Sequence, residues 1–328
     1  MSIDRTGVYI QELCGIQRRY QRRILRQGED LGCNAIGANL FTSKVYAGGL
    51  NNQYPWPIVN GAYKLDKIRP QFLNRMETLA DMAKQYGQVL YLYAWQVPDE
   101  RHFANGSLPQ PNRTWHGVPC TWQDFSAWSS KAQGAHKYLY DQVRNRIGIS
   151  AWVRWIDATE PQVGALGFPP NELTADFINW TPADKRFRMF SSIMDRDNPA
   201  HWGDQRLFGI SIKSNGFSTG WPAGLNGKII VDTDTGGVSV PPPAMKKWPV
   251  KGRAPRGYVG LPLANSPGQA AQFYTDQMQG HTAEAFLCFA TMMWRMQRWA
   301  FLGDTEGVIS LKTQPYRRIL TEMAAARC

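Results

Sequence analysis

The amino-acid sequence predicts an α/β protein of one domain, residues 1–328, folded as a single (β/α)8 barrel with long rim loops. Apolar, strand-like runs alternate with segments of helical period, a pattern typical of a parallel sheet with crossover helices. With a short first strand near residues 7–10, the runs number about eight, which is the number that a closed barrel needs. Barrels of this class often reach this length as one domain. A doubly wound open sheet is the competing arrangement.

The first half of the chain supplies three of these strands. An arginine-bearing helix follows the first strand, and a strand over residues 33–41 and a polar loop over residues 42–67 come next. Pro70 suits the first turn of a helix, because its missing N–H is not needed there, and apolar residues recur at helical spacing after it. Gly87 ends this helix, and residues 88–95 form a buried strand.

The second half begins with a polar loop over residues 98–121. The elements expected after it are a helix over residues 122–146, a strand over 149–156, a loop containing Pro169 and Pro170, a helix over 182–194, strands over 207–212 and 228–232, a weaker strand at 258–261, a helix over 269–279, a strand over 285–294 and a last helix over 315–326. Residues 215–227 and 236–256 contain no clear helix, so the strand count depends on that region.

The most informative short motif is Thr159-Glu160-Pro161, at the end of the strand predicted over residues 149–156. Pro161 has no backbone N–H and disfavours helical dihedrals at Glu160, so the strand should end there. In a parallel barrel, catalytic side chains sit at the carboxyl ends of strands. Glu160 is therefore the first candidate catalytic residue, and a solvated loop carboxylate is the alternative.

The formal net charge of +11 is concentrated in part on one predicted helix. Its arginines are Arg18, Arg19, Arg22, Arg23 and Arg26. Helical spacing spreads them over a broad exposed face, and a solvated surface is the simplest interpretation. No zinc-finger spacing, RNA-binding strand motif or basic zipper accompanies them, so a nucleic-acid partner is not expected. An acidic polysaccharide or a neighbouring protein subunit is the partner that such a surface leaves open.

We expect no membrane span, classical export signal, metal or other cofactor. No apolar run is long enough to cross a bilayer, and the N-terminus has an early acid, Asp4, and no apolar signal core. Five cysteines without a C-x-x-C pair argue against a disulfide framework and a zinc site. Cys33 and Cys288 lie in strand-like stretches and are expected in the core. His116 and Cys120 are four residues apart but lack a second ligand pair.

The order of elements and one short motif resemble the clan A glycoside hydrolases, TIM-barrel enzymes that include endoglucanases and β-mannanases. Residues 72–92 look like the family's helix leading into its third strand. Residues 158–161 look like its Asn-Glu-Pro end of strand four, where the Glu is the general acid/base, and the resemblance implies that role for Glu160. The approach to Trp294 is similar to the last strand, whose Trp forms a sugar platform. The resemblance covers about residues 30–300.

The sequence departs from this family at two positions. The family's Asn before the acid/base is Thr159 here, which has no amide N–H to offer a sugar hydroxyl. The family's nucleophile is a Glu that ends strand seven. If residues 258–261 are strand seven, that place holds an apolar residue; if residues 228–232 are, Asp232 or Asp234 supplies a shorter carboxylate. Asp234 lies closer to the following loop and is the preferred candidate, with a turn-forming Asp as the alternative.

Two functions follow from the predicted rim and the family resemblance. The expected rim residues are Glu160 and Asp234 for catalysis, and Asn39, Trp95, Thr159 and Trp294 for substrate binding, because each lies at or near the carboxyl end of a strand. Thirteen tryptophans also suit stacking on sugar rings. One function is a glycoside hydrolase acting on a β-linked polysaccharide. The other is a barrel without chemistry, a carbohydrate-binding or structural component of a larger assembly such as a surface or virion appendage.

Overall fold

The protein is described by a computed structural model that covers residues 1–328. The residues described are 3–10, 13–15, 18–30, 32–40, 55–59, 62–96, 128–148, 150–159, 170–184, 187–193, 204–212, 229–235 and 282–290.

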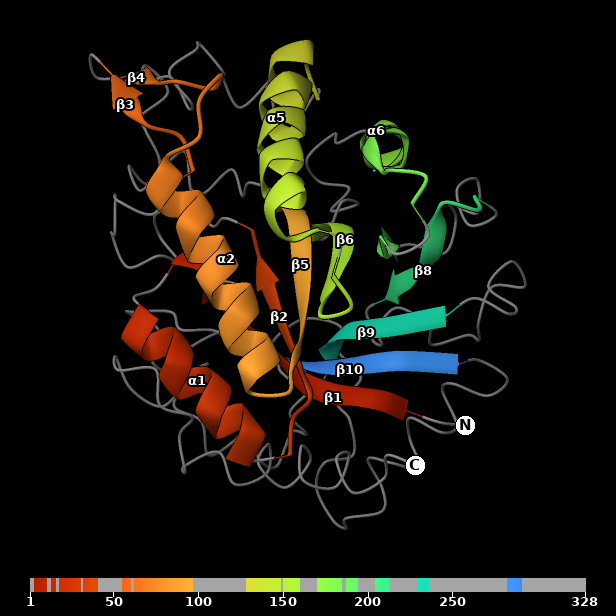
Figure 1. Cartoon of the computed structure of the whole chain (residues 1–328). Helices are drawn as coiled ribbons and strands as arrows, with labels where there is room; N and C mark the ends of the chain where they lie inside the picture. Colours follow the sequence, from red (N-terminus) through yellow and green to blue (C-terminus); the bar gives the residue numbers. More distant parts are fainter. Residues whose placement is uncertain are drawn as a thin grey trace, which may run out of the picture.

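The central feature is a closed barrel of eight parallel strands (Figure 1). The strands are β1 (Ile3–Ile10), β2 (Ala35–Asn39), β5 (Val89–Gln96), β6 (Val153–Thr159), β7 (Met189–Ile193), β8 (Leu207–Ile212), β9 (Ile229–Thr235) and β10 (Thr282–Ala290). Each pairs with the next in this order, and β10 pairs with β1 to close the ring. The predicted (β/α)8 barrel is therefore confirmed, and the competing open sheet is wrong.

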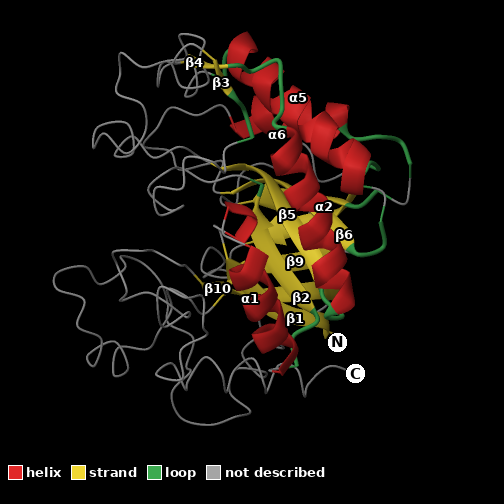
Figure 2. Ribbon diagram, turned by 60° about the vertical axis from the view of Figure 1, so that its left-hand side comes forward, coloured by secondary structure: helices red, strands yellow, loops and turns green. Residues whose placement is uncertain are grey.

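The described helices lie on the outer side of the strands (Figure 2). They are α1 (Arg18–Asp30), α2 (Pro70–Gln85), α5 (Ser130–Ile147) and α6 (Pro170–Trp180), with a short 3-10 helix, η1 (Leu13–Gly15), before α1. Pro70 opens α2 as the sequence predicted, and Gly87 takes the left-handed φ of 64° that ends it. At the start of α5, the Ser129 hydroxyl oxygen accepts a hydrogen bond from the backbone N–H of Ala132.

The fold differs from the sequence-based expectation between residues 170 and 194. A helix was expected over residues 182–194, but β7 (Met189–Ile193) is a barrel strand there, with Met189 and Phe190 fully buried. The preceding helix is α6, which begins at Pro170, where a loop was expected. The predicted loop at residues 42–67 also contains a hairpin, β3 (Ile58–Val59) and β4 (Ala62–Tyr63). Asn60-Gly61 between them is a favoured two-residue hairpin sequence.

Apolar side chains fill both faces of the barrel wall. The interior cluster consists of Tyr9, Ala35, Val89, Tyr91, Tyr93, Ile156 and Phe190. On the outer face, the Trp155 ring meets the Tyr140 ring of α5 edge-on, with centroids 5.1 Å apart. Strands buried on both faces read as nearly continuous apolar runs, which is why the sequence predicts most of them. The expected core position of Cys33 is confirmed, whereas the Cys288 side chain lies outside the description.

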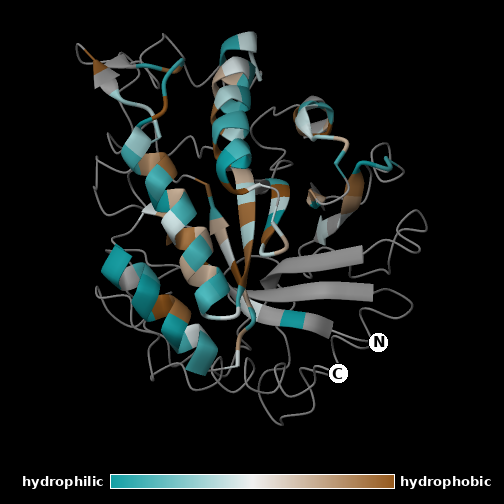
Figure 3. Cartoon of the chain, in the orientation of Figure 1, coloured by the Kyte–Doolittle hydropathy of each residue, from teal (hydrophilic) through white to brown (hydrophobic). Residues whose placement is uncertain are grey.

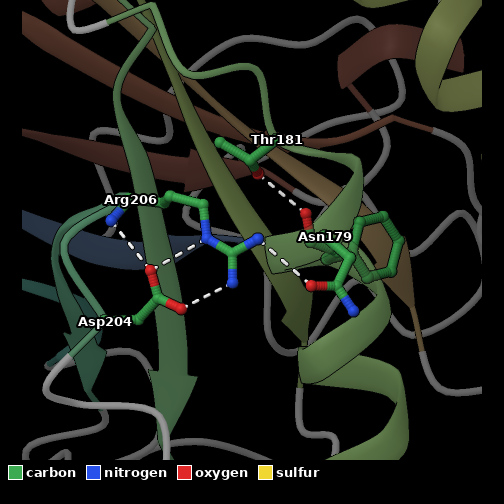
Figure 4. A network of polar contacts seen from close by, with 5 residues as sticks. Asn179, Thr181, Asp204 and Arg206 are labelled. Carbon is green, nitrogen blue, oxygen red and sulfur yellow. Dashed lines mark hydrogen bonds and ion pairs between the residues drawn. The ribbon is translucent and has the colours of Figure 1, made fainter.

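A polar network joins the last turn of α6 to the residues that precede β8 (Figure 4). The Arg206 guanidinium donates to Asp204 through Nε at 3.0 Å and Nη2 at 2.6 Å, and through Nη1 to Asn179 Oδ1 at 3.1 Å. Hydrogen bonding to Asp204 raises the pKa of Arg206. Because β8 starts at Leu207, this network lies at the amino-terminal end of the barrel, where such contacts serve stability.

Candidate active site

Four of the predicted site residues lie at the carboxyl ends of parallel strands. Asn39 is the last residue of β2, Trp95 the last but one of β5, Thr159 the last of β6, and Asp234 the last but one of β9. In a closed parallel barrel these ends form one rim, which in this class of fold carries the chemistry. Glu160 follows Thr159 directly and lies outside the described residues.

The strand order resolves which segment is strand seven. Counted from β1, β6 is the fourth strand and β9 the seventh, and β9 pairs directly with β8 and with β10. Residues 258–261 lie outside the described residues, and the ring of eight strands is complete without them. Asp232 and Asp234 are therefore the acidic residues of strand seven. Trp294, four positions beyond the end of β10 (Thr282–Ala290), is outside the description.

A register irregularity marks the rim end of β9. Asp232 pairs with Phe286 and Thr235 pairs with Cys288. Between these two pairs β9 therefore advances by three residues while β10 advances by two. An extra residue of this kind is a β-bulge, which bends the strand and re-aims side chains, often beside active sites. The bulge lies between Asp232 and Thr235, the interval that contains Asp234.

Below the rim, three polar and aromatic side chains pack together inside the barrel. The Tyr9 hydroxyl donates a hydrogen bond to Asn39 Oδ1 at 2.5 Å, and the Tyr9 and Tyr93 rings lie 4.8 Å apart. Asn39 is fully buried. Sequence analysis singled out Asn39 but missed Tyr9 and Tyr93, although the period of two along β1 and β5 could have placed both inside. Asn39 is thus held by the protein, and a contact with sugar stays a prediction.

The end of β6 is fixed from outside by α6. Ile156 belongs to the interior cluster, and Asp157, the next residue, is buried on the opposite face. There the Thr174 hydroxyl of α6 donates to Asp157 Oδ2 at 3.2 Å. This contact anchors the strand three residues before Glu160. No local sequence pattern indicates this contact, since it depends on how α6 packs against β6.

A buried histidine lies on the outer layer of the barrel. His136 of α5 stacks on Trp128 with centroids 5.5 Å apart, and its edge meets Trp56, which precedes β3. Trp128 is held in turn by a hydrogen bond from its Nε1 to Asp176 Oδ2 at 2.7 Å. Burial lowers the pKa of His136 to about 3. Its ring is therefore neutral near pH 7 and serves packing.

The described residues offer no evident metal site. No group of three or more His, Cys, Asp or Glu side chains is placed to hold an ion within these residues. Cys14 and Cys33 are buried free thiols, and burial raises the pKa of Cys14. His116 and Cys120 lie outside the description. No described helix has the length and apolar character that crossing a bilayer requires.

Comparison with known proteins identifies the fold. No family model and no curated protein matches the sequence. Several solved structures match, and three of them serve as examples. An endo-1,4-β-mannanase from Rhizomucor miehei is 12% identical with a TM-score of 0.58, and the match covers 99% of this chain and 95% of that one. A GH5_18 variant from Streptomyces cattleya in complex with Manβ1-4GlcNAc is 12% identical with a TM-score of 0.55, and the match covers 98% and 80%. A candidate glycoside hydrolase from Bacteroides vulgatus is 14% identical with a TM-score of 0.56, and the match covers 97% and 56%.

These structures share the barrel of this chain. At such low identity the likeness concerns the fold alone, and the chain spans little more than half the length of the Bacteroides protein. The resemblance to clan A glycoside hydrolases is thus confirmed at the level of the fold. Activity and substrate do not follow from it.

Proposed function

We propose that this protein is a glycoside hydrolase acting on a β-linked polysaccharide, with Glu160 as general acid/base and Asp234 as its carboxylate partner. The observation that carries the proposal is the strand count. The fourth strand ends directly before Glu160, and Asp234 lies at the rim end of the seventh. These are the two strands that bear the carboxylates in the family that the sequence resembles.

The local geometry supports both assignments. Ile156 faces the interior, and a strand continuing past Thr159 with the same period of two would bring Glu160 to that face. Asp157 fixes the strand from behind through Thr174. An Asp is one methylene shorter than the family's Glu, and the backbone of Asp234 lies within the register irregularity between β9 and β10.

The chemistry needs two carboxyl groups at a defined distance. About 5–5.5 Å suits a retaining reaction, in which the second carboxylate attacks the sugar, and about 6.5–9.5 Å suits an inverting one, in which it activates water. In both, Glu160 protonates the leaving oxygen. The solved structures that share the fold include a 1,4-β-mannanase and a complex with Manβ1-4GlcNAc, which favours a β-linked glycan as the ligand.

The second candidate is a barrel that binds a glycan without cleaving it, as a component of a larger assembly. Two observations favour it: Thr159 ends β6 where the family has Asn, and strand seven carries no Glu. A displacement of about 1 Å in a catalytic group can cost about 10²-fold in rate, so a shorter carboxylate alone could end catalysis.

Release of reducing ends from β-mannan, cellulose and xylan tests the proposal. Glu160→Gln keeps the shape of the side chain and removes its proton, so we expect a loss of about 10²-fold or more. Asp234→Asn should lose activity equally. Asp232→Asn on the same strand is the matched control for Asp234, and Glu77→Gln on α2 is the control for Glu160.

The outcomes separate the two candidates. If the wild type cleaves a glycan and Glu160→Gln cleaves it equally well, the assignment of Glu160 is wrong. If neither protein cleaves but both bind a glycan with equal affinity, the barrel is a binding module. Loss of activity in Asp232→Asn alone would transfer the partner role from Asp234 to Asp232.

A further inference from the structure

Helix α1 carries a basic surface that the proposed hydrolysis does not use. The helix follows β1 and precedes β2, so it runs along the outside of the barrel from the rim side toward the amino-terminal end. It lies beside α2 (Figures 1 and 2). It is mostly hydrophilic, with an apolar band (Figure 3).

The arginine face of α1 consists of five exposed residues: Arg18, Arg19, Arg22, Arg23 and Arg26. With 3.6 residues per turn, they fall within about 140° of the helix circumference. The opposite side of the helix is buried through Gln21 and Ile24. The sequence-based expectation of a broad exposed face is confirmed.

Three of these arginines form a regular stripe. Arg18, Arg22 and Arg26 follow one another at four-residue intervals, with about 6 Å between successive positions along the axis. No ion pair of these three is present among the described residues, whereas Arg19 and Arg23 make contacts of their own. The helix has no acidic residue before Glu29. The stripe is therefore available to an anion from outside.

The arrangement works against the stability of the helix. Like charges four residues apart repel each other. The first turn of a helix favours acids and the last turn favours bases, yet α1 has no acid in its first turn and no base in its last. The stability of α1 therefore does not explain why these arginines are present. Binding of a polyanion would explain them, because it would neutralise the repulsion between them.

The composition of the described surface favours a hydrated polyanion over a protein. Protein interfaces depend on apolar or aromatic anchors at their centre. Among the described residues, the large apolar side chain that is exposed is Val59, which belongs to β3 and not to α1. Guanidinium groups, in contrast, bind oxyanions through paired N–H donors.

We propose that the arginine face of α1 docks an acidic β-linked polysaccharide, through carboxylate or sulfate groups on its sugars, and holds the chain beside the rim. The inference rests on the proposed function and narrows its substrate class. A face that starts on the rim side would keep a long substrate close between cleavage events, and its attraction should weaken with salt.

Binding of poly-β-1,4-mannuronate and neutral β-1,4-mannan to the full chain tests the inference, in a Glu160→Gln background that prevents cleavage. The first variant carries Arg18→Glu, Arg22→Glu and Arg26→Glu. The control carries Lys67→Glu, Lys84→Glu and Lys131→Glu at exposed positions elsewhere, and changes the net charge by the same amount.

We expect the arginine variant to bind polymannuronate about tenfold more weakly at low salt, given three exposed charge contacts, and the control to bind within about twofold of the parent. Mannan binding should be equal in all three proteins. A sulfated mannan run in parallel decides between carboxylate and sulfate. Thermal unfolding checks the fold: three glutamates at the same four-residue intervals repel one another as the three arginines do, so the melting temperature should change little.

Equal polymannuronate binding by the arginine variant would overturn the inference, and so would an equal loss in the control. Duplex DNA that binds as tightly as polymannuronate, and competes with it, would also overturn it in favour of a general polyanion surface. If wild-type protein cleaves no β-glycan while α1-dependent binding of polymannuronate persists, the docking stands and only the proposed hydrolysis fails.

Discussion

Acidification should destabilise this protein through His136. The side chain is 1% exposed, and burial lowers its pKa from 6.5 to about 3. Between these two pKa values, His136 therefore binds a proton in the unfolded chain but not in the folded one. The contribution of the neutral His136 ring to the free energy of unfolding is complete above the pKa that the residue has in the unfolded chain. It is lost progressively as the pH falls from there toward the lower pKa of the folded state.

The size of the effect follows from the pKa difference. At pH 5 the solution is about 1.5 units below the unfolded pKa, and each unit is worth about 1.4 kcal/mol. The free energy of unfolding should thus fall by about 2 kcal/mol between pH 7 and pH 5 from this residue alone. At pH 3, where about half of the folded molecules also carry the proton, the loss is about 4 kcal/mol.

Urea unfolding at both pH values measures this loss. His136→Phe keeps a ring between Trp56 and Trp128 and removes the titration, and the other four histidines are common to both proteins. The drop in unfolding free energy from pH 7 to pH 5 should be about 2 kcal/mol smaller in the variant, whatever its stability at pH 7. Equal drops in the two proteins would show that folding does not lower the pKa of His136.

Three further predictions concern the barrel. Gly7→Ala should prevent closure, because a Cβ there would lie 1.9 Å from a backbone carbonyl oxygen of β2; circular dichroism of the purified variant checks this, and a native spectrum would contradict it. Tyr9→Phe removes the hydrogen bond to Asn39 and should cost about 1–3 kcal/mol in urea unfolding, with an unchanged value refuting a contribution to stability. Glu77→Ala breaks an exposed ion pair with Arg146 and should lower the free energy of unfolding by less than about 1 kcal/mol. A larger decrease in urea unfolding would show that this ion pair contributes more than exposed pairs usually do.

Much of the barrel was predictable because its strands are buried on both faces and flanked by strong stop signals. Gly87 and Pro70 bound α2 through backbone properties of their own, so the prediction there was accurate. β5 reads as an unbroken apolar run and was placed within one residue. In such segments, local propensity and tertiary structure agree.

The failures have a physical cause as well. Phe187, Met189 and Phe190 are buried at spacings that also suit a helix, and six or seven residues are too few to distinguish the two periods. β7 is a strand because it completes the sheet between β6 and β8, a constraint that its own sequence does not express. At α6, the pair Pro169-Pro170 indicated a loop, yet Pro170 occupies the first helical position, where its missing N–H costs nothing.

The candidate site shows the same limit more sharply. Glu160 was singled out from one strand and one proline, whereas the choice of Asp234 depended on which of two segments is strand seven, and only the strand order of the closed ring decides that. The bulge at Asp232–Thr235 arises from pairing with β10, a strand about 50 residues further along the chain. The local sequence of β9 therefore does not predict it. In the proposed function, the position of the Asp234 backbone at the rim therefore depends on the pairing of β9 with β10 as well as on the sequence of β9.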